Sequence, residues 1–203
     1  MGSKYSPNQL IFIDESSKDE RTLSRHYGYS LRNTHAVEKT VFVRGKRYTM
    51  LPALSLDGII ALDIMEGSCD KQRFNKFIMD KVVCRVRCIL LLIVIDSLLS
   101  LQLPQMRPYP EKHSVIVLDN AQIHRNADWI DMVKNAGGHV EFLPPYSPDF
   151  NPIELAFSSI KAFLKRYNEL IEMQEDNEYC LAIACAQISA EKATQFFKHC
   201  MYL

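Results

Sequence analysis

The sequence has no excess of charge of either sign. Its 203 residues contain 24 Lys and Arg against 24 Asp and Glu, so the formal net charge is zero. Domains that bind nucleic acids are usually basic, and any nucleic acid contact here would have to use a local basic face. The length suits one ordinary domain, and a hydrophobic fraction of 47% is enough for a substantial core.

Several motifs that carry common chemistries are missing. There is no Walker P-loop and no GxGxxG, so a loop that cradles a nucleotide has no support. The six cysteines form no CxxC pair and have no histidine at zinc spacing. Because no secretory signal is recognisable, we expect reduced thiols in an intracellular protein. No internal repeat or low-complexity segment is present.

A long apolar run is also lacking. The apolar stretch from Cys88 to Leu103 has 16 residues and is interrupted by Asp96 and two serines. A transmembrane helix needs about 20 residues, so we expect no membrane partner. The block 83–103 differs in composition from both flanks, and we hypothesise that it is an insertion or a translated intron. A buried helix or strand is the ordinary alternative.

Two short apolar runs have the pattern of strands buried on both faces, namely residues 10–13 and 114–118. Asp14 directly follows the first run, and Asp119 directly follows the second. Open α/β sheets place ligand chemistry at the carboxyl ends of their strands. For Asp14, the ordinary alternative is that Asp-Glu-Ser-Ser simply begins a solvated loop.

The remaining pattern predicts a mixture of strands and helices. We expect strands at 39–43, 48–56, 59–64 and 140–143, with a tight turn at Asp57-Gly58. We expect helices at 70–83, around 129–133 and at 176–199, the second stopped by Gly137-Gly138. In the last helix, the residues expected to be buried are Leu181, Ala184, Ile188 and Phe196. Polar residues at 16–34 are expected to form a solvated loop.

The stretch 143–166, LPPYSPDFNPIELAFSSIKAFLKR, joins a stiff proline turn to a strongly patterned helix. Asn151 stands where an N-cap belongs, and Pro152 occupies the first helical position. One helical stripe is apolar, and it consists of Ile153, Phe157, Ile160 and Leu164. The neighbouring stripe is polar, and it consists of Glu154, Ser158, Lys161 and Lys165. The ordinary interpretation of Glu154 is a capping-box residue.

The two aspartates and Glu154 could converge if two adjacent strands end side by side and a helix end packs across them. Such a cluster of like charges is costly unless a cation sits within it. Hard divalent ions with oxygen ligands, Mg²⁺ or Mn²⁺, suit that role. Two such ions about 4 Å apart can activate a water or hydroxyl and stabilise the leaving oxygen of a phosphodiester.

Three segments in this order, IFIDES, VIVLDNAQIH and LPPYSPDFNPIE, closely resemble the catalytic core of mariner-type transposases, which are DDE-type, RNase H-like nucleotidyl transferases. The 34 residues between Asp119 and Glu154 match that family's spacing. The resemblance covers about residues 9–82 and 104–170. It implies an α/β, RNase H-like fold with a mixed sheet flanked by helices. The core would span 9–170, between a polar lead-in at 1–8 and a helical extension at 171–203.

The resemblance also implies a chemistry. Asp14, Asp119 and Glu154 would bind two Mg²⁺ or Mn²⁺ ions. Water would cleave DNA at transposon ends, and the freed 3′-hydroxyl would attack target DNA. Candidate DNA contacts are Asn120, His124, Lys161 and Lys165, of which Asn120 and His124 could instead support the metal ligands. The ordinary alternatives are a turn residue at 120, a helix-start residue at 124 and a solvated lysine face on the helix. The implied partners are transposon-end and target DNA and a second copy of the chain, in the nucleus or the cytoplasm.

Transposases of this family carry helix-turn-helix modules before the catalytic core, and here the first strand begins near residue 10. We therefore expect an impaired, truncated or degenerate copy. An alternative is a catalytically inactive, transposon-derived remnant that binds DNA or protein. A third interpretation is a cellular RNase H-like nuclease that acts on RNA–DNA hybrids, which the proline-rich last motif disfavours.

Overall fold

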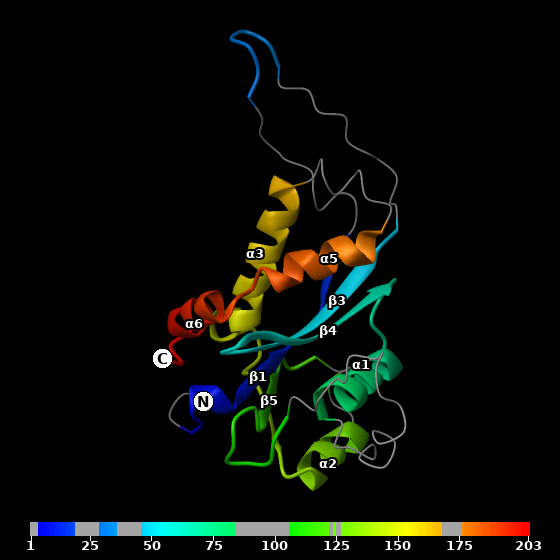
Figure 1. Ribbon diagram of the computed structural model, residues 1–203, viewed down its shortest axis with the longest axis vertical. Helices are drawn as coiled ribbons and strands as arrows, with labels where there is room; N and C mark the ends of the chain where they lie inside the picture. The colour runs from blue at the N-terminus through cyan, green and yellow to red at the C-terminus, as the bar shows by residue number, and fades with distance from the viewer. Residues whose placement is uncertain are drawn as a thin grey trace, which may run out of the picture.

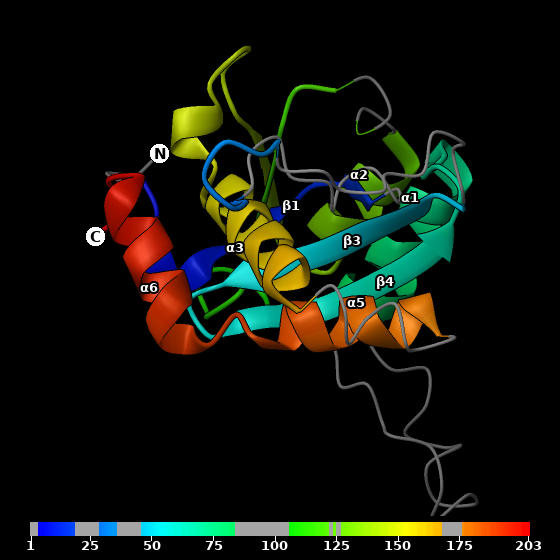
Figure 2. The same ribbon diagram turned by 90° about the horizontal axis from the view of Figure 1, so that it is seen from above.

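The sheet at the centre of the molecule is mixed, and helices cover both of its faces (Figures 1 and 2). This computed structural model describes residues 4–18, 29–35, 46–83, 106–121, 124, 127–167 and 176–203. Within them the strands are β1 (Leu10–Ile13), β2 (Ser16–Lys18), β3 (Tyr48–Ser55), β4 (Gly58–Glu66), β5 (Val115–Leu118) and β6 (His139–Phe142). The predicted mixed sheet flanked by helices is therefore confirmed.

The pairing of the strands puts β1 in the middle of the sheet. β5 runs parallel to β1, with Leu10 opposite Val115 and Ile13 opposite Leu118, and β6 continues the parallel part beyond β5. On its other side β1 pairs antiparallel with β3. β3 and β4 form the hairpin expected around Asp57-Gly58, and β4 lies at the edge of the described sheet. The parallel pair β1 and β5 brings two carboxyl ends to one place.

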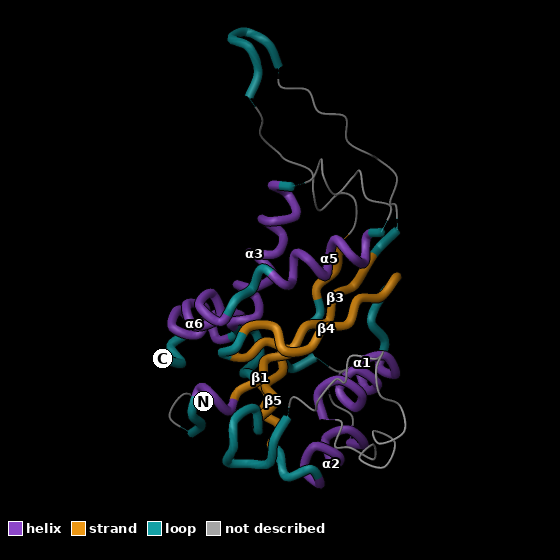
Figure 3. The backbone as a smooth tube through the Cα atoms, viewed as in Figure 1, coloured by secondary structure: helices purple, strands orange, loops and turns teal. Residues whose placement is uncertain are grey.

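The all-apolar strands are explained by a core on each face of the sheet. Side chains alternate along a strand, so Leu10 and Phe12 face one layer while Ile11 and Ile13 face the other. The first layer consists of α3 (Pro152–Arg166), α5 (Asn177–Ala186) and α6 (Ala190–His199). The second consists of α1 (Lys71–Phe77), the π-helical turn η3 (Ile78–Val83) and α2 (Ala127–Asn135). Figure 3 shows these helices around the strands.

Local signals in the sequence account for most helix ends. The Asp70 side chain accepts a hydrogen bond from the Arg73 N–H and caps α1. Gly137 has φ +84° after α2, a left-handed conformation that glycine adopts without strain, so the predicted stop is confirmed. Asn151 caps α3 through its side-chain oxygen, and Pro152 is the first helical residue, as predicted.

The single helix predicted at 176–199 is wrong, because the chain forms two helices there. α5 ends at Ala186 and α6 begins at Ala190, with Ser189 accepting a hydrogen bond from the Lys192 N–H as the new N-cap. The break changes the helical phase. Phe197 is therefore fully buried, whereas Phe196 is only partly buried.

Two further differences concern polar segments near the N-terminus. Ser16–Lys18, expected to begin a solvated loop, forms β2 and pairs antiparallel with β3, with Ser16 opposite Met50. Tyr5, in the predicted polar lead-in, is buried, and its hydroxyl donates to Oε1 of Glu141 at 2.6 Å. The strand predicted at 39–43 and nearly all of block 83–103 lie outside the described residues.

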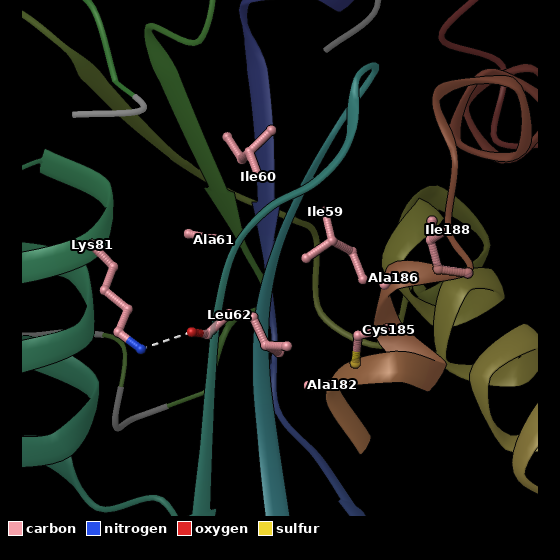
Figure 4. Close-up of a pocket in the computed structure, with 9 residues that line it drawn as sticks. All are labelled: Ile59, Ile60, Ala61, Leu62, Lys81, Ala182, Cys185, Ala186 and Ile188. Atoms are coloured by element: carbon pink, nitrogen blue, oxygen red, sulfur yellow. Dashed lines mark hydrogen bonds between the residues drawn. The ribbon is translucent and has the colours of Figure 1, made fainter. Parts of the chain in front are cut away.

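A groove of about 520 Å³ lies along the edge strand β4 (Figure 4). Ile59 and Leu62 of β4 line it together with Cys185 of α5. Lys81 also lines it, and its Nζ donates to the Leu62 carbonyl at 2.8 Å. β3 separates β4 from β1, so this groove belongs to the edge of the sheet rather than to the β1–β5 ends. No helix in the described parts of the chain has the length and apolar character needed to cross a membrane.

Candidate active site

Two of the predicted acids follow neighbouring parallel strands. Ile13 and Leu118 are register partners and end their strands, so Asp14 and Asp119, the residues that follow, leave the sheet side by side. Asp14 is 9% exposed, whereas the Asp119 side chain is 45% exposed. The buried β1–β5 pair therefore presents one enclosed and one accessible carboxylate at the same edge.

The Asp14 carboxylate is held by two donors. Its Oδ1 accepts from the Glu15 N–H at 2.7 Å, and its Oδ2 accepts from Nδ2 of Asn151 at 3.1 Å. Burial raises the pKa of Asp14 to about 7, with further contributions from the charges of Asp119, Glu15 and Glu154. The raised pKa means that the buried negative charge of Asp14 is under-compensated by the protein.

Asn151 joins the cap of α3 to this carboxylate. Its side-chain oxygen accepts from the Ile153 N–H at 3.4 Å while its amide nitrogen donates to Asp14. The Asn151 backbone N–H donates to the carbonyl of Pro148 at 2.9 Å, which is the donor that a capping box would give to Glu154. Glu154 is exposed in the first turn of α3, three residues after Asn151.

Replacing Asn151 by alanine should cost about 2–4 kcal/mol of unfolding free energy, because a cap and a donor to a buried carboxylate are both lost. Asn151→Asp keeps a capping oxygen but removes the amide donor, and it should also destabilise. The matched control is Ser189→Ala, which removes only the cap of α6 and should cost about 1 kcal/mol. Urea unfolding measures all three, and equal costs for Asn151→Ala and Ser189→Ala would contradict the role of the Asp14 contact.

Asp119 is held through a buried histidine. Its Oδ1 accepts from the Ala121 N–H at 3.0 Å and lies 2.7 Å from Nδ1 of His124. His124 is fully buried, and its Nε2 lies 3.0 Å from Oε2 of Glu15. The imidazole ring packs on Phe74 of α1, with ring centroids 4.5 Å apart. A chain of contacts thus connects the end of β1 to the loop after β5.

The charge state of His124 follows from its two carboxylate neighbours. Burial alone lowers the pKa of His124, but the contacts with Asp119 and Glu15 outweigh it and raise the pKa to about 9. One ring nitrogen lies beside the Asp119 carboxylate and the other beside the Glu15 carboxylate, so the positively charged imidazolium is the form favoured between them. The imidazolium in turn lowers the pKa of Asp119, which keeps that residue ionised.

The other predicted residues lie around these acids. Asn120 follows Asp119 and is partly exposed, and Lys161 and Lys165 are partly exposed along α3. His124 has no exposed surface, so its position favours support of Asp119 over direct contact with DNA. The polar stripe expected on α3 is present, since Glu154 and Ser158 are exposed while its apolar stripe is buried.

The chemical type of the side chains at this site, carboxylates, fits a hard divalent cation. Carboxylate oxygens are the ligands that Mg²⁺ and Mn²⁺ prefer, and a nearby cation would compensate the buried charge of Asp14. The three carboxylates are not gathered closely, however. Among the described residues, no three His, Cys, Asp or Glu side chains stand close enough together to hold an ion. Asp14 and Asp119 are the neighbouring pair, and Glu154 acts on Asp14 through its charge.

Sequence reasoning missed two residues of this site. Glu15 stands next to Asp14 in the printed sequence, but only the fold shows that its side chain reaches His124. The sequence predicts Asn151 as a helix cap, but its second contact, with Asp14, has no local signal. The partners are 109 and 137 positions apart in the chain. For His124, the signal in the sequence was the DNAQIH segment.

The mixed sheet flanked by helices is that of an RNase H-like fold, and the acids that follow its adjacent strands form a candidate active site. A family model described as "DDE superfamily endonuclease" matches residues 9–176. The chain belongs to this family. No curated protein matches the chain.

Solved structures of Mos1 transposase share the fold. The catalytic domain of Mos1 mariner transposase has a TM-score of 0.53 and 15% identity, over 98% of this chain and 79% of that one. The mariner Mos1 paired-end complex with Mg has a TM-score of 0.55 and 15% identity, over 97% of this chain and 55% of that one. A paired-end complex with the left transposon end has a TM-score of 0.53 and 16% identity. The chain therefore spans about half of the Mos1 chains in these complexes.

Proposed function

We propose that the chain cleaves DNA strands and transfers the freed ends to a target, in the manner of a mariner-type transposase. The observation that carries this proposal is the pair Asp14 and Asp119 at the ends of adjacent parallel strands. Asn151 ties the first of them to the helix that begins with Glu154. Family membership supports the endonuclease class, and the Mos1 complexes with transposon ends support DNA as the partner.

In this proposal Asp14, Asp119 and Glu154 hold two Mg²⁺ or Mn²⁺ ions. When bound, such ions activate the attacking water or 3′-hydroxyl and stabilise the leaving oxygen. The residues of the chain set the geometry. Asn151 and the Glu15 N–H orient Asp14, while Ala121 and His124 orient Asp119. Mos1 structures that contain Mg or Mn support the choice of ion.

DNA would lie across the carboxylates and along α3 in this proposal. Lys161 and Lys165 extend from the same helix as Glu154, one and two turns beyond Ser158, and are suited to contact phosphates. Asn120 is placed beside Asp119 for a similar contact. We further propose that a second copy of the chain takes part, as in synapsis of two ends, and that the site of action is the nucleus.

The test is nicking of supercoiled plasmid by the purified chain with Mn²⁺, Mg²⁺ or chelator. The proposal expects nicking that needs metal and prefers duplex DNA. Preference for an RNA–DNA hybrid would instead favour a cellular RNase H-like nuclease. Folded protein that shows no cleavage and binds no Mn²⁺ would overturn the enzyme assignment.

The second candidate is an inactive, transposon-derived protein that binds DNA or protein. It is favoured by one observation: in the described part of the chain, no three metal-ligating side chains are gathered tightly enough to hold an ion. Calorimetric titration of Mn²⁺ separates the two candidates, because an inactive remnant would bind no metal. A gel-shift assay would then show whether such a remnant binds DNA.

We also propose that the block 83–103 is an insertion into an otherwise continuous core. The Met106 N–H donates to the carbonyl of Val82 at 3.0 Å, so the positions before and after the block lie next to each other. Val82, Val83 and Met106 are all buried in the same core as α1 and α2. Comparing the genomic DNA sequence with the messenger RNA sequence tests the intron hypothesis. A transcript that is never spliced there would count against it.

Replacing residues 84–105, which include nearly all of the block, by a short Gly-Ser turn is expected to leave a cooperatively folding protein. Because Met106 already contacts Val82, joining the chain there requires little rearrangement of the core. Circular dichroism melting should give a midpoint within a few degrees of the full chain, with less aggregation because an apolar run is removed. Loss of cooperative unfolding would show that the block contributes to the core.

A further inference from the structure

Glu15 is the residue through which both aspartates are connected. It follows Asp14 directly and precedes β2, so it stands at the carboxyl end of the central strand. Its backbone N–H donates to Oδ1 of Asp14 at 2.7 Å. Its side chain turns in the other direction, toward the loop that follows β5. Neither the family match nor the spacing of the acids assigns it a role.

The side chain of Glu15 reaches Asp119 through one intermediate. Oε2 and Oε1 of Glu15 lie 3.0 and 3.2 Å from Nε2 of His124, so both oxygens face one nitrogen. Nδ1 of the same ring lies 2.7 Å from Oδ1 of Asp119. Because its oxygens face the imidazole, Glu15 is placed to support the ligands rather than to bind an ion itself.

The ring between the two carboxylates has little freedom to move. His124 is fully buried and packs on the fully buried ring of Phe74. The backbone N–H of His124 donates to the Ala121 carbonyl at 3.2 Å, while the backbone N–H of Ala121 donates to the Asp119 side chain. A shift of the imidazole would therefore disturb the short loop that carries Asp119. The Glu15 contact is what holds the far nitrogen of that ring.

We infer that Glu15 is a positioning residue that sets the separation of Asp14 and Asp119, through its N–H on one and through His124 on the other. The inference rests on the proposed function, since it assumes that these aspartates bind metal. Contacts of this kind orient metal ligands, and their removal commonly lowers metal affinity by about 10- to 100-fold. Glu15 thereby links β1 and β5 beyond the last hydrogen bonds of the sheet.

The experiment is calorimetric titration of Mn²⁺ into the full chain and its variants. Glu15→Ala should weaken Mn²⁺ binding by about 10- to 100-fold. Glu15→Gln keeps an oxygen acceptor for His124 and should restore part of that affinity, which a general loss of stability would not do. Glu191→Ala, which removes an exposed carboxylate from the first turn of α6, is the matched control and should bind as the parent does.

A second readout needs no metal. The Ala121 N–H donates to Asp119, so its hydrogen exchange reports whether that carboxylate is held in place. In Glu15→Ala this amide should exchange about 2- to 10-fold faster, whereas amides in β5 should keep their protection. Unchanged exchange at Ala121 would overturn the inference even if the variant were less stable overall.

The outcomes separate this inference from the proposed function. If the parent chain binds no Mn²⁺, the proposed function fails, and the exchange of Ala121 alone decides the role of Glu15. If Mn²⁺ binds to the parent and is lost in the Asp14→Asn, Asp119→Asn double variant, the proposed function stands. Parent-like affinity in Glu15→Ala would then overturn the inference by itself.

Discussion

Replacement of Asp119 by asparagine is expected to abolish metal-dependent nicking of plasmid DNA. Asparagine keeps an oxygen for the Ala121 N–H and for His124, so the loop should retain its shape. It removes the negative charge, and with it a ligand that Mg²⁺ or Mn²⁺ requires. The loss should be at least about 100-fold, beyond the roughly 10- to 100-fold typical of outer contacts.

The control for this prediction is Asp131→Asn on α2. Asp131 is exposed, and its replacement removes the same charge from the chain without touching the strand ends. Nicking by this variant should equal that of the parent, and both variants should melt within a few degrees of the parent. Full activity in Asp119→Asn would mean that cleavage arises elsewhere or from a contaminating nuclease.

The second large effect is expected at Phe197, which anchors α6 to the sheet. Its ring is fully buried and meets Phe12 of β1 edge-to-face, with centroids 5.4 Å apart. Tyr202 follows the helix and donates its hydroxyl to the carbonyl of Phe150, on the proline turn before α3. Phe197→Ala should cost about 3–5 kcal/mol and lower the melting temperature by roughly 6–20 °C.

Phe196 is the natural control for that substitution, because it is the adjacent residue of the same type. It is only partly buried, so Phe196→Ala should destabilise clearly less than Phe197→Ala. Thermal or urea unfolding of both variants decides the matter. The reverse order would mean that α6 packs in the phase expected for one uninterrupted helix, without the break at 187–189.

The burial of Phe197 also shows that the C-terminal helices pack against the central sheet rather than apart from it. The segment 171–203, expected as a helical extension, contains α5 and α6, and both bury side chains in the core that α3 and β1 share. Because Asp14 directly follows β1, a loosened α6 should weaken Mn²⁺ binding as well as stability. The C-terminal helices thereby support the strand that positions the candidate site.

Local patterns in the sequence determined much of the framework. Residues 10–13 are apolar at every position, which is the pattern of a strand with a core on each face, and the structure has that strand. The Asn151-Pro152 pair marked the start of α3 because capping depends only on neighbouring residues. The three motifs and their spacing indicated the family, which the family match confirmed.

Contacts between distant segments were decided only by the tertiary structure. Nothing near Glu15 predicts that it meets His124, 109 positions away, or that Asn151 meets Asp14 across 137 positions. Such contacts depend on how β1, the loop after β5 and α3 dock together, and that depends on the packing of two whole cores. The sequence by itself determined which acids follow the two buried strands, whereas packing decided how those acids are held.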